Sequence, residues 1–510
     1  MEMNYAKTVE KWGTLEVAVK GPKEGNPFCD QWIKGTFECK NEKKTVDGFY
    51  DGDGVYKVRF MPSFVDTYTF KIESSFQTES AEEVSGSFEA VAPSADNHGP
   101  VRVAGTYYLA YEDGKPYHCI GTTCYVWNLQ NEKLQEQTLK TLEENAFNKI
   151  RFCIFPKHYD YNLHEPITYP YEGTPCDTSE LNENNFAEYN GCAPGNDWDF
   201  TRFNPAHFQH IEECIKKLMA LGIQADLIVM HPYDRWGFSM MKAEDDDRYW
   251  KYVLARFSAY RNVWWSLANE YDLMHEKTLA DWERYAAIIC EKDPYHHLRS
   301  IHNCKAYYDY NLPWVTHCSI QRTETYRSSE LVNEWREKYH KPVVLDEICY
   351  EGNIQFGWGN ISGEEMTRRF WEAFCRGGYP GHGETYLSPD RILWWSHGGV
   401  LHGTSPDRIR FLAKIMEETP GLGVEPMPCK WDEVACRAAG FPARKDYFIY
   451  YYSFMRPGFR DFYFDDTTEY QVEIIDTWEM TVTDGGIHKG KFRVKLPGKE
   501  YMAVRLQIAK

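Results

Sequence analysis

Between residues 101 and 424, short apolar strands alternate with helical segments along the chain. Eight segments have the apolar, β-branched character of buried strands: residues 117–125, 148–155, 223–230, 262–269, 298–303, 314–321, 342–347 and 377–384. This alternation is typical of parallel sheets, and eight units predict a closed (β/α)8 barrel. An open doubly wound sheet is the alternative, but no Gly-x-Gly-x-x-Gly follows the first strand.

Capping residues mark several of the intervening helices. Asn204 and Pro205 predict a helix start, because the Asn side chain can cap a helix and Pro suits its first position. Gly222 predicts the end of that helix. Residues 131–147 and a segment that begins at Ser405 also carry apolar residues at helical spacing.

Both ends of the chain are rich in short strands separated by turn residues, which is typical of β-sandwiches. The predicted domains are an N-terminal β-sandwich at residues 1–92, the catalytic barrel at 101–424 and a C-terminal β-sandwich at 425–510. The loose segment 92–100 reads as a linker.

The bulk composition excludes some function classes. The 510 residues carry a net charge of −19, which repels phosphate backbones and argues against nucleic-acid binding. The sequence contains no run near the roughly 20 apolar residues of a membrane span. The start at Met1 shows no signal peptide, so a cytoplasmic location is expected. The 15 cysteines are scattered and predict reduced thiols rather than disulfides or a zinc site. The sequence is compatible with a homo-oligomer and does not determine the oligomeric state.

Two of the predicted strands end in carboxylates. The fourth ends in Asn269 and Glu270, and the seventh ends in Glu347. Polar residues are disfavoured in strands, and catalytic groups of such barrels lie at the strands' C-terminal ends. Strands four and seven lie on opposite sides of the barrel mouth, so the two carboxyls are expected to face each other across it. The alternative interpretation is that each glutamate only forms a salt bridge at the rim of the barrel.

A facing pair of carboxylates predicts glycoside hydrolysis. A separation of about 5–5.5 Å gives retention through a covalent intermediate, and about 6.5–9.5 Å gives inversion. Glu270 is expected to be protonated at rest and Glu347 ionised. Asn269 is placed to bond the sugar's 2-hydroxyl. No metal or organic cofactor is needed, and the sequence has no H-E-x-x-H and no H-x-H strand start.

Aromatic residues supply candidate sugar platforms, because apolar sugar faces stack on rings. Four tryptophans are predicted in rim loops, with core packing as the alternative: Trp127, Trp236, Trp394 and Trp395. Asp234 and Asp346 are further carboxylates near the mouth. Asp346 is the poorer nucleophile, because neighbouring strand residues point to opposite sides.

The chain resembles retaining (β/α)8 glycoside hydrolases with Asn-Glu on strand four and Glu on strand seven. More closely, it resembles bacterial apiosidase-like barrel proteins with an N-terminal and a C-terminal β-sandwich. The matching segments are Tyr117-His-Cys-Ile-Gly-Thr-Thr-Cys-Tyr-Val-Trp127, His231-Pro-Tyr-Asp-Arg-Trp-Gly237, Trp264-Trp-Ser-Leu-Ala-Asn-Glu-Tyr-Asp272, Val343-Val-Leu-Asp-Glu347 and Gly381-His-Gly-Glu-Thr-Tyr386.

This resemblance implies roles for individual residues. Glu270 matches the acid/base and Glu347 the nucleophile. Arg151 matches an Arg that supports the nucleophile, with a buried partner of an Asp as the alternative. His231 matches a histidine at the end of strand three, with a structural histidine as the alternative. Because some apiosidase-like enzymes are thought to use an Asp in place of one Glu, Asp234 stays a candidate.

Other residues at the barrel mouth complete the predicted site. His302 ends strand five, and Gln321 ends strand six, where the clan more often has an aromatic or a His. This departure leaves the nucleophile's hydrogen-bond partner open between Tyr350 and Tyr386. His382, in the last matching segment, is a further substrate-binding candidate.

The predicted function is a retaining, exo-acting glycosidase for small plant-derived glycosides or oligosaccharides. A transglycosylase with the same carboxylate pair is one alternative, and a carbohydrate-binding protein on an inactive barrel is another. In each case the predicted partner is a carbohydrate.

Overall fold

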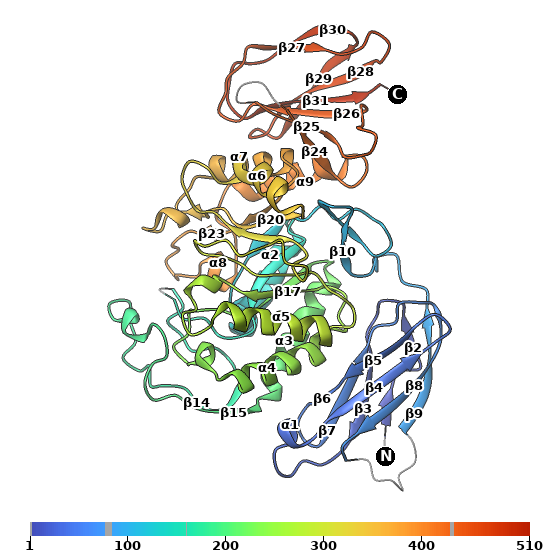
Figure 1. Ribbon diagram of the computed structural model, residues 1–510. Helices are drawn as coiled ribbons and strands as arrows, with labels where there is room; N and C mark the ends of the chain where they lie inside the picture. The colour runs from blue at the N-terminus through green and yellow to red at the C-terminus, as the bar shows by residue number, and fades with distance from the viewer. Residues whose placement is uncertain (1–2, 77–83, 160, 429–432, 510) are drawn as a thin grey trace.

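A computed structural model describes residues 3–76, 84–159, 161–428 and 433–509. Figure 1 shows a central barrel with a β-rich unit on either side of it, one formed by the start of the chain and one by its end. In the described part of the chain, no helix is both long and apolar enough to cross a membrane.

Eight parallel strands form the barrel: β12 (Gly121–Thr123), β13 (Lys149–Cys153), β16 (Gln224–Met230), β17 (Val263–Ala268), β18 (Arg299–Ser300), β19 (Cys318–Gln321), β20 (Val343–Glu347) and β22 (Tyr379–His382). They are hydrogen-bonded in the order β18-β17-β16-β13-β12-β22-β20-β19, and a parallel bridge between His302 and Ser319 joins the two outer strands. The predicted (β/α)8 barrel is confirmed, with all eight strands at the expected positions.

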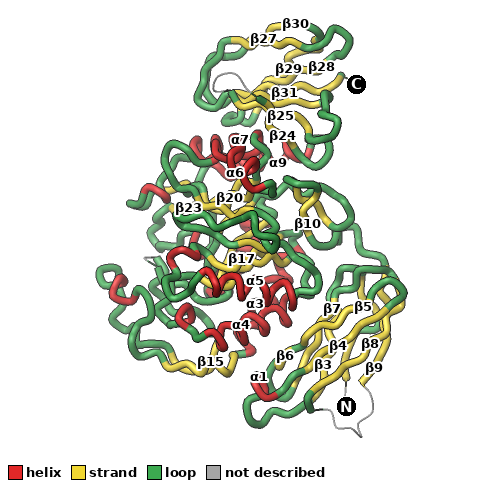
Figure 2. The backbone as a smooth tube through the Cα atoms, viewed as in Figure 1, coloured by secondary structure: helices red, strands yellow, loops and turns green. Residues whose placement is uncertain are grey.

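Helices surround the barrel (Figure 2). The longer ones are α2 (Glu132–Glu143), α3 (Pro205–Ala220), α4 (Ala243–Phe257), α5 (Leu279–Lys292), α6 (Val332–Tyr339), α7 (Gly363–Cys375) and α9 (Ser405–Glu417). The Asn204 side chain caps α3 by accepting from the Ala206 N–H, with Pro205 at the first helical position. Gly222, with φ +72°, follows the end of this helix, a conformation that glycine adopts without strain. The predicted boundaries of α3 are confirmed.

The N-terminal unit is a sandwich of two sheets, in the orders β1-β3-β7-β6 and β2-β9-β8-β4-β5. Its strands are β1 (Met3–Tyr5), β2 (Thr8–Glu10), β3 (Leu15–Lys20), β4 (Ile33–Glu38), β5 (Lys43–Asp47), β6 (Phe49–Tyr50), β7 (Val55–Phe60), β8 (Asp66–Ser74) and β9 (Val84–Val91). Arg59 of β7 donates to Glu212 of α3, and both side chains are buried. This ion pair attaches the sandwich to the outside of the barrel.

The C-terminal unit has a six-stranded sheet, in the order β24-β25-β26-β31-β28-β29, and a two-stranded sheet of β27 and β30. Its strands are β24 (Val424–Met427), β25 (Val434–Ala438), β26 (Tyr447–Tyr451), β27 (Phe459–Tyr463), β28 (Tyr470–Asp476), β29 (Thr481–His488), β30 (Lys491–Lys495) and β31 (Met502–Ile508). Trp371 of α7 stacks on Tyr451 of β26, with ring centroids 5.6 Å apart. This sheet therefore packs on the helical layer of the barrel.

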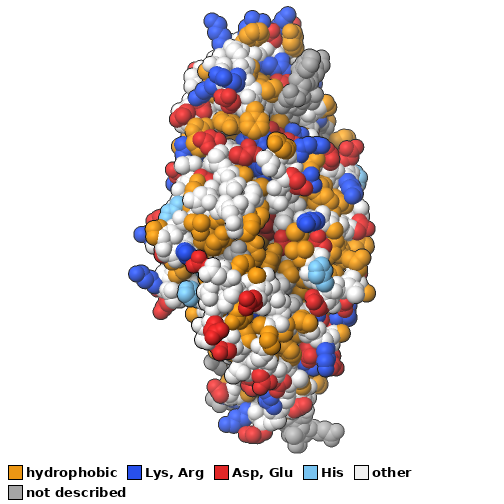
Figure 3. Space-filling view, turned by 90° about the vertical axis from the view of Figure 1, so that its left-hand side faces the viewer, with side chains coloured by type: hydrophobic (Ala, Val, Ile, Leu, Met, Phe, Trp, Pro, Cys, Tyr) orange, Lys and Arg blue, Asp and Glu red, His pale blue; other side chains and the backbone are white. Residues whose placement is uncertain are grey.

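The loops that follow the barrel strands build one face of the molecule, which includes the hairpin of β14 (Tyr171–Thr174) and β15 (Asp197–Phe203). This face lies on the left of Figure 1 and toward the viewer in Figure 3, where hydrophobic side chains gather near its centre. Catalytic sites of such barrels lie on this face.

Candidate active site

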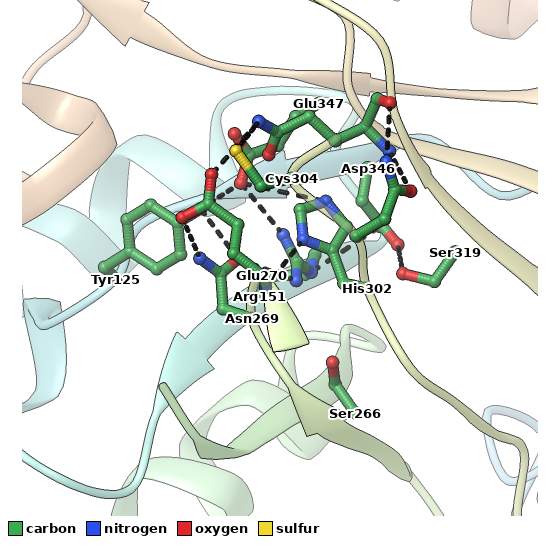
Figure 4. Close-up of polar contacts among 12 residues, drawn as sticks. Tyr125, Arg151, Ser266, Asn269, Glu270, His302, Cys304, Ser319, Asp346 and Glu347 are labelled. Carbon is green, nitrogen blue, oxygen red and sulfur yellow. Dashed lines mark hydrogen bonds and ion pairs between the residues drawn. The ribbon is translucent and has the colours of Figure 1, made fainter. Parts of the chain in front are cut away.

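Two buried glutamates meet at the carboxyl ends of the fourth and seventh barrel strands (Figure 4). Glu270 directly follows β17 and has a left-handed backbone, with φ +52°. Glu347 is the last residue of β20. Each is only 6% exposed. A left-handed conformation is unusual for a residue other than glycine, and such strain concentrates at functional sites.

The Glu347 carboxylate has its own set of donors. The Tyr125 hydroxyl, just beyond β12, donates a hydrogen bond to it. Arg151 Nη1 lies 3.5 Å from its Oε1. His302 Nε2 lies 3.8 Å from the same oxygen. Burial holds the pKa of His302 well below its usual value, so this imidazole is a neutral neighbour.

The electrostatic setting of Glu347 differs from the sequence-based expectation of a fully ionised nucleophile. Burial and the nearby Glu270 raise the pKa of Glu347 to about 7, although Arg151 and Tyr125 act in the opposite direction. In the ligand-free pocket, near neutral pH, a large share of Glu347 is therefore protonated.

Glu270 accepts hydrogen bonds from three other side chains. The Tyr233 hydroxyl donates to it, Gln321 Nε2 donates from 3.0 Å, and Asn269 Nδ2 donates from 3.2 Å. Gln321 is in turn anchored, because its backbone N–H donates to Asn303 Oδ1 at 3.1 Å. These contacts fix the direction of the carboxyl.

Asn269 connects the surroundings of the two glutamates. Its Oδ1 accepts from Arg151 Nη2 at 3.2 Å and lies 3.1 Å from the Tyr125 hydroxyl. Its Nδ2 donates to Glu270. A continuous set of hydrogen bonds therefore joins Glu347 to Glu270 and holds the two carboxyls in one arrangement.

Both carboxyls line a pocket of about 290 Å³. Its lining residues are Tyr125, Lys157, Tyr159, Tyr233, Glu270, Cys304, Lys305, Gln321, Thr323, Glu347, Tyr350, Trp358 and Trp395. The volume is at the lower end of the roughly 300–1,000 Å³ that is typical of ligand sites. Six of the lining residues are Tyr or Trp, which suits stacking on a sugar face. The buried Tyr350 hydroxyl interacts with Glu347 and lowers the pKa of that carboxyl.

Several lining residues were missed by sequence reasoning. They are Tyr125, Lys157, Tyr159, Tyr233, Cys304, Lys305, Thr323 and Trp358. Tyr125 and Tyr233 lie just beyond the first and third barrel strands, so counting strand ends would have found them. Lys157 and Trp358 come from loops, and no local pattern points to them.

Some predicted residues lie outside the pocket because they support loops. Asp234 accepts from the backbone N–H groups of Trp236, Gly237 and Ser239, at 3.0, 3.0 and 2.6 Å. Burial raises its pKa. Its oxygens are thus taken up by a turn, and it does not face the two glutamates.

Three of the four predicted tryptophan platforms do not line the pocket. Trp127, Trp236 and Trp394 are at most 1% exposed. Trp127 packs edge-on against Phe152, and Trp394 Nε1 donates to Thr122 Oγ1 at 2.8 Å. They are packed interior residues, since their loops fold back onto the barrel.

Three other predicted binding residues also lie elsewhere. His231 is buried, with Nε2 3.4 Å from the Phe155 carbonyl. His382 stacks on Phe147, with centroids 4.7 Å apart. The Tyr386 hydroxyl donates to Glu351 rather than to Glu347. None of the three lines the pocket. Tyr125 donates to Glu347, and Tyr350, in the same pocket, lowers the pKa of Glu347 through a side-chain hydrogen bond. Tyr386 has neither role.

Asp346 belongs to the barrel interior rather than to the pocket. Lys149 Nζ donates to both Asp346 and Asp226, at 2.7 Å each. Arg151 Nε is 3.7 Å from Asp346. These cations hold the pKa of Asp346 well below its usual value. Arg151 thus combines both predicted roles, because it neighbours buried Asp residues and also Glu347.

The side chains of the described residues do not form a metal-binding cluster. Among the residues that the structure describes, no three His, Cys, Asp or Glu side chains gather in a way that could hold a metal ion. The cysteines within the described ranges are free thiols, and Cys429 lies outside those ranges.

Comparisons with known proteins agree with this geometry. Residues 104–410, more than half of the chain, match the family described as "Apiosidase-like, catalytic domain". The chain belongs to the apiosidase-like family. The flanking residues 8–75 and 431–507 match two domains of unknown function, DUF5060 and DUF5605. No curated protein matches the chain.

Solved structures extend the comparison to the whole apiosidase-like chain. A proposed glycoside hydrolase from Bacteroides vulgatus is 37% identical, with a TM-score of 0.90, and the match covers 99% of this chain and 100% of that one. A family 5 glycoside hydrolase from the same organism is 16% identical, with a TM-score of 0.60, and covers 81% of this chain and 93% of that one. The second likeness shows the fold alone. Family and relatives together place the protein among the glycoside hydrolases.

Proposed function

We propose that this protein is a retaining glycoside hydrolase that removes a terminal sugar from small glycosides or oligosaccharides. The observation that carries the proposal is the pairing of Glu270 and Glu347, at the ends of strands four and seven, in one aromatic pocket. Tyr125 donates a hydrogen bond to Glu347, Tyr233 and Gln321 donate to Glu270, and both glutamates line the cavity.

In the proposed reaction, Glu347 attacks the anomeric carbon while Glu270 protonates the leaving oxygen. Glu270 then removes a proton from water, which releases the sugar from Glu347. Arg151 and Tyr125 favour the ionised form of Glu347, so they support the attacking state. Asn269, which contacts the surroundings of both carboxyls, is the residue that we expect to bond the 2-hydroxyl of the sugar.

The size of the pocket supports removal of terminal units. A space of about 290 Å³ walled by six aromatic residues suits one or two sugar rings rather than a long chain crossing the barrel. Trp358 and Trp395 have centroids 5.2 Å apart and would form part of the wall that a ring stacks on. We therefore infer exo action.

The test is a panel of aryl glycosides covering the common sugars, both anomers, and short oligosaccharides. We expect release of the aryl group from one anomeric series. NMR of the first-formed sugar should show the same anomeric configuration as the substrate. Inverted product would contradict the proposed nucleophile. An added alcohol acceptor distinguishes hydrolysis from transglycosylation. A transglycosylase would give mainly the alkyl glycoside, whereas a hydrolase would give mainly free sugar.

A further inference from the structure

Lys157 is a buried cation in the pocket that the proposed mechanism does not use. It lies in the loop after β13, is 4% exposed and lines the same cavity as the two glutamates. It forms no hydrogen bond or ion pair with any residue in the described ranges. The buried Lys149 of the barrel interior, by contrast, lies between two aspartates.

Aromatic rings surround the Lys157 ammonium instead of acceptors. Its Nζ lies 3.7 Å from the ring centroid of Tyr125, 4.4 Å from Trp395, 4.5 Å from Tyr233 and 5.0 Å from Tyr159. Rings attract a cation, but they cannot replace the hydrogen bonds that the ammonium has in water. Its N–H groups therefore have no acceptor among the residues that the structure describes.

The position of Lys157 relates it to the reacting sugar. Tyr125 holds Glu347 and Tyr233 holds Glu270, and Lys157 lies against the rings of both tyrosines. The ammonium is therefore close to the space between the two carboxyls, where the sugar under attack must lie. Burial lowers the pKa of Lys157 to about 8, so at neutral pH it is mainly charged.

We propose that Lys157 binds an oxyanion, a carboxylate or a sulfate, on the sugar unit that occupies this pocket. The substrate is then an acidic glycoside. The proposal rests on the function proposed above, because it concerns the same pocket.

Charge balance supports an acidic sugar. Two carboxylates in the pocket would repel an anionic substrate unless a cation compensated for them. Lys305, which is exposed, lines the same pocket and adds a second positive charge at its edge. The chain as a whole carries a net charge of −19, so two lysines here do not reflect a generally basic surface.

A structural role for Lys157 is the alternative, in which the ammonium only offsets the charge of the glutamates. The two roles predict different specificity. A structural cation supports hydrolysis of neutral and acidic sugars equally, whereas an oxyanion receptor favours the acidic member of a matched pair.

The experiment compares aryl glycosides in matched pairs that differ only at C6, namely glucoside with glucuronide and galactoside with galacturonide, together with the 6-sulfated forms. We expect the wild-type kcat/KM to favour an acidic member by about 10- to 100-fold, in line with hydrogen bonds to charged groups. Preference for the uronide or for the sulfate identifies which oxyanion is bound. Equal or higher rates with the neutral member of every pair would overturn the proposal.

Variants of Lys157 give the second readout. Lys157→Met keeps the length of the side chain and packs well on rings, and Lys157→Gln serves if the Met variant does not fold. We expect either variant to lose the preference for the acidic sugar, because its kcat/KM falls further on the acidic member than on the neutral member of each pair. Equal loss on both members of a pair would show the structural role. Lys133→Met, an exposed site on α2, is the matched control.

Failure of the proposed function gives a separate result. If no glycoside is hydrolysed, thermal shifts with the same sugars test binding alone. Stabilisation by an acidic sugar that is absent in Lys157→Met supports the oxyanion site without hydrolysis. No shift with any acidic sugar at millimolar concentration overturns it.

Discussion

Two pairs of buried glutamates lie near the carboxyl ends of the barrel strands, and only one pair lines the pocket. The first pair is Glu270 and Glu347. The second is Glu351, in β21 (Glu351–Gly352), and Glu384, in β23 (Glu384–Thr385). All four are at most 6% exposed. Burial raises the pKa of Glu347 to about 7 and that of Glu384 to about 8.

The pairs differ in what donates hydrogen bonds to them. Glu351 accepts from the N–H groups of Thr404 and Ser405, at 2.7 and 3.0 Å. Glu384 accepts from those of His402 and Gly403, at 2.6 and 2.8 Å. These backbone donors belong to one loop, which leads into α9. The second pair therefore stabilises a loop.

The comparison shows that burial and a raised pKa do not by themselves identify a catalytic carboxylate. The pocket pair is distinguished by the absence of backbone donors among the described residues and by carboxyls that line a cavity. The first prediction follows from this difference and is the largest. Glu347→Ala and Glu270→Ala should each lower kcat at least about a thousandfold, as in other hydrolases, whereas Glu384→Gln should leave it within a few-fold. Steady-state kinetics on the best aryl glycoside measures both.

Added azide sharpens this prediction. In Glu347→Ala it should restore turnover and give a glycosyl azide of inverted configuration, because azide takes the place of the nucleophile. In Glu270→Ala it should give the retained configuration. Near-wild-type activity of either Ala variant would contradict the assignment.

The second prediction concerns the loop pair. Glu351→Ala should lower the free energy of unfolding by about 3 kcal/mol, because it leaves several buried donors without an acceptor. The activity per folded molecule should change only a few-fold. Urea unfolding and active-site-normalised kinetics test this, and a catalytic loss like that of Glu347→Ala in a stable protein would remove the distinction between the pairs.

The third prediction concerns the raised pKa of one glutamate in each pair, Glu347 and Glu384. Because the pKa of Glu347 is raised from 4.5 to about 7, the folded state binds more protons than the unfolded state between these pH values. Stability is therefore lost as pH rises through this window. Glu347→Gln should raise the free energy of unfolding at pH 8 by about 1–3 kcal/mol, from about 1.4 kcal/mol per pKa unit, with little gain at pH 4.

Urea unfolding of wild type and Glu347→Gln at both pH values measures this effect, with Glu384→Gln as the companion variant. An equal effect of Glu347→Gln at pH 4 and pH 8 would show that the carboxyl does not titrate in this range.

The fourth prediction is the smallest and concerns Tyr125. An attacking Glu347 must be ionised, so kcat/KM should rise with pH through about 7. Tyr125→Phe removes a donor to the ionised form and should move this limb to higher pH, with a loss of about tenfold at pH 7. Tyr386→Phe, which loses a donor to Glu351 instead, is the control. An unchanged limb in Tyr125→Phe would show that the hydroxyl does not stabilise the carboxylate.

The barrel could be predicted because its strands are continuous apolar runs, and their order along the chain determines their place in the ring. Glu270 and Glu347 were predicted from that order, from the unusual polarity of the two strand ends and from the family resemblance. The same reasoning could not separate Trp395, which lines the pocket, from Trp394 beside it, which points into the interior. Side-chain direction in a loop depends on how the loop packs.

Loop residues limited the prediction in a second way. Lys157 follows β13, and nothing around it in the sequence indicates a ring of aromatic side chains from other loops. Asp234 was a catalytic candidate because some apiosidase-like enzymes are thought to use an Asp, but both of its carboxyl oxygens accept from backbone N–H groups of the turn that follows. Both outcomes depend on contacts between segments far apart in the chain.

Trapping of the covalent intermediate tests the central claim most directly. A 2-deoxy-2-fluoro glycoside of the sugar that the enzyme cleaves, with a dinitrophenyl leaving group, should inactivate it. The fluorine slows both steps, and the activated leaving group keeps attachment of the sugar faster than its release. Mass spectrometry of a protease digest should then show one added sugar on Glu347. A label on Asp346 or Glu351, or turnover with an inverted product and no label at all, would contradict the account.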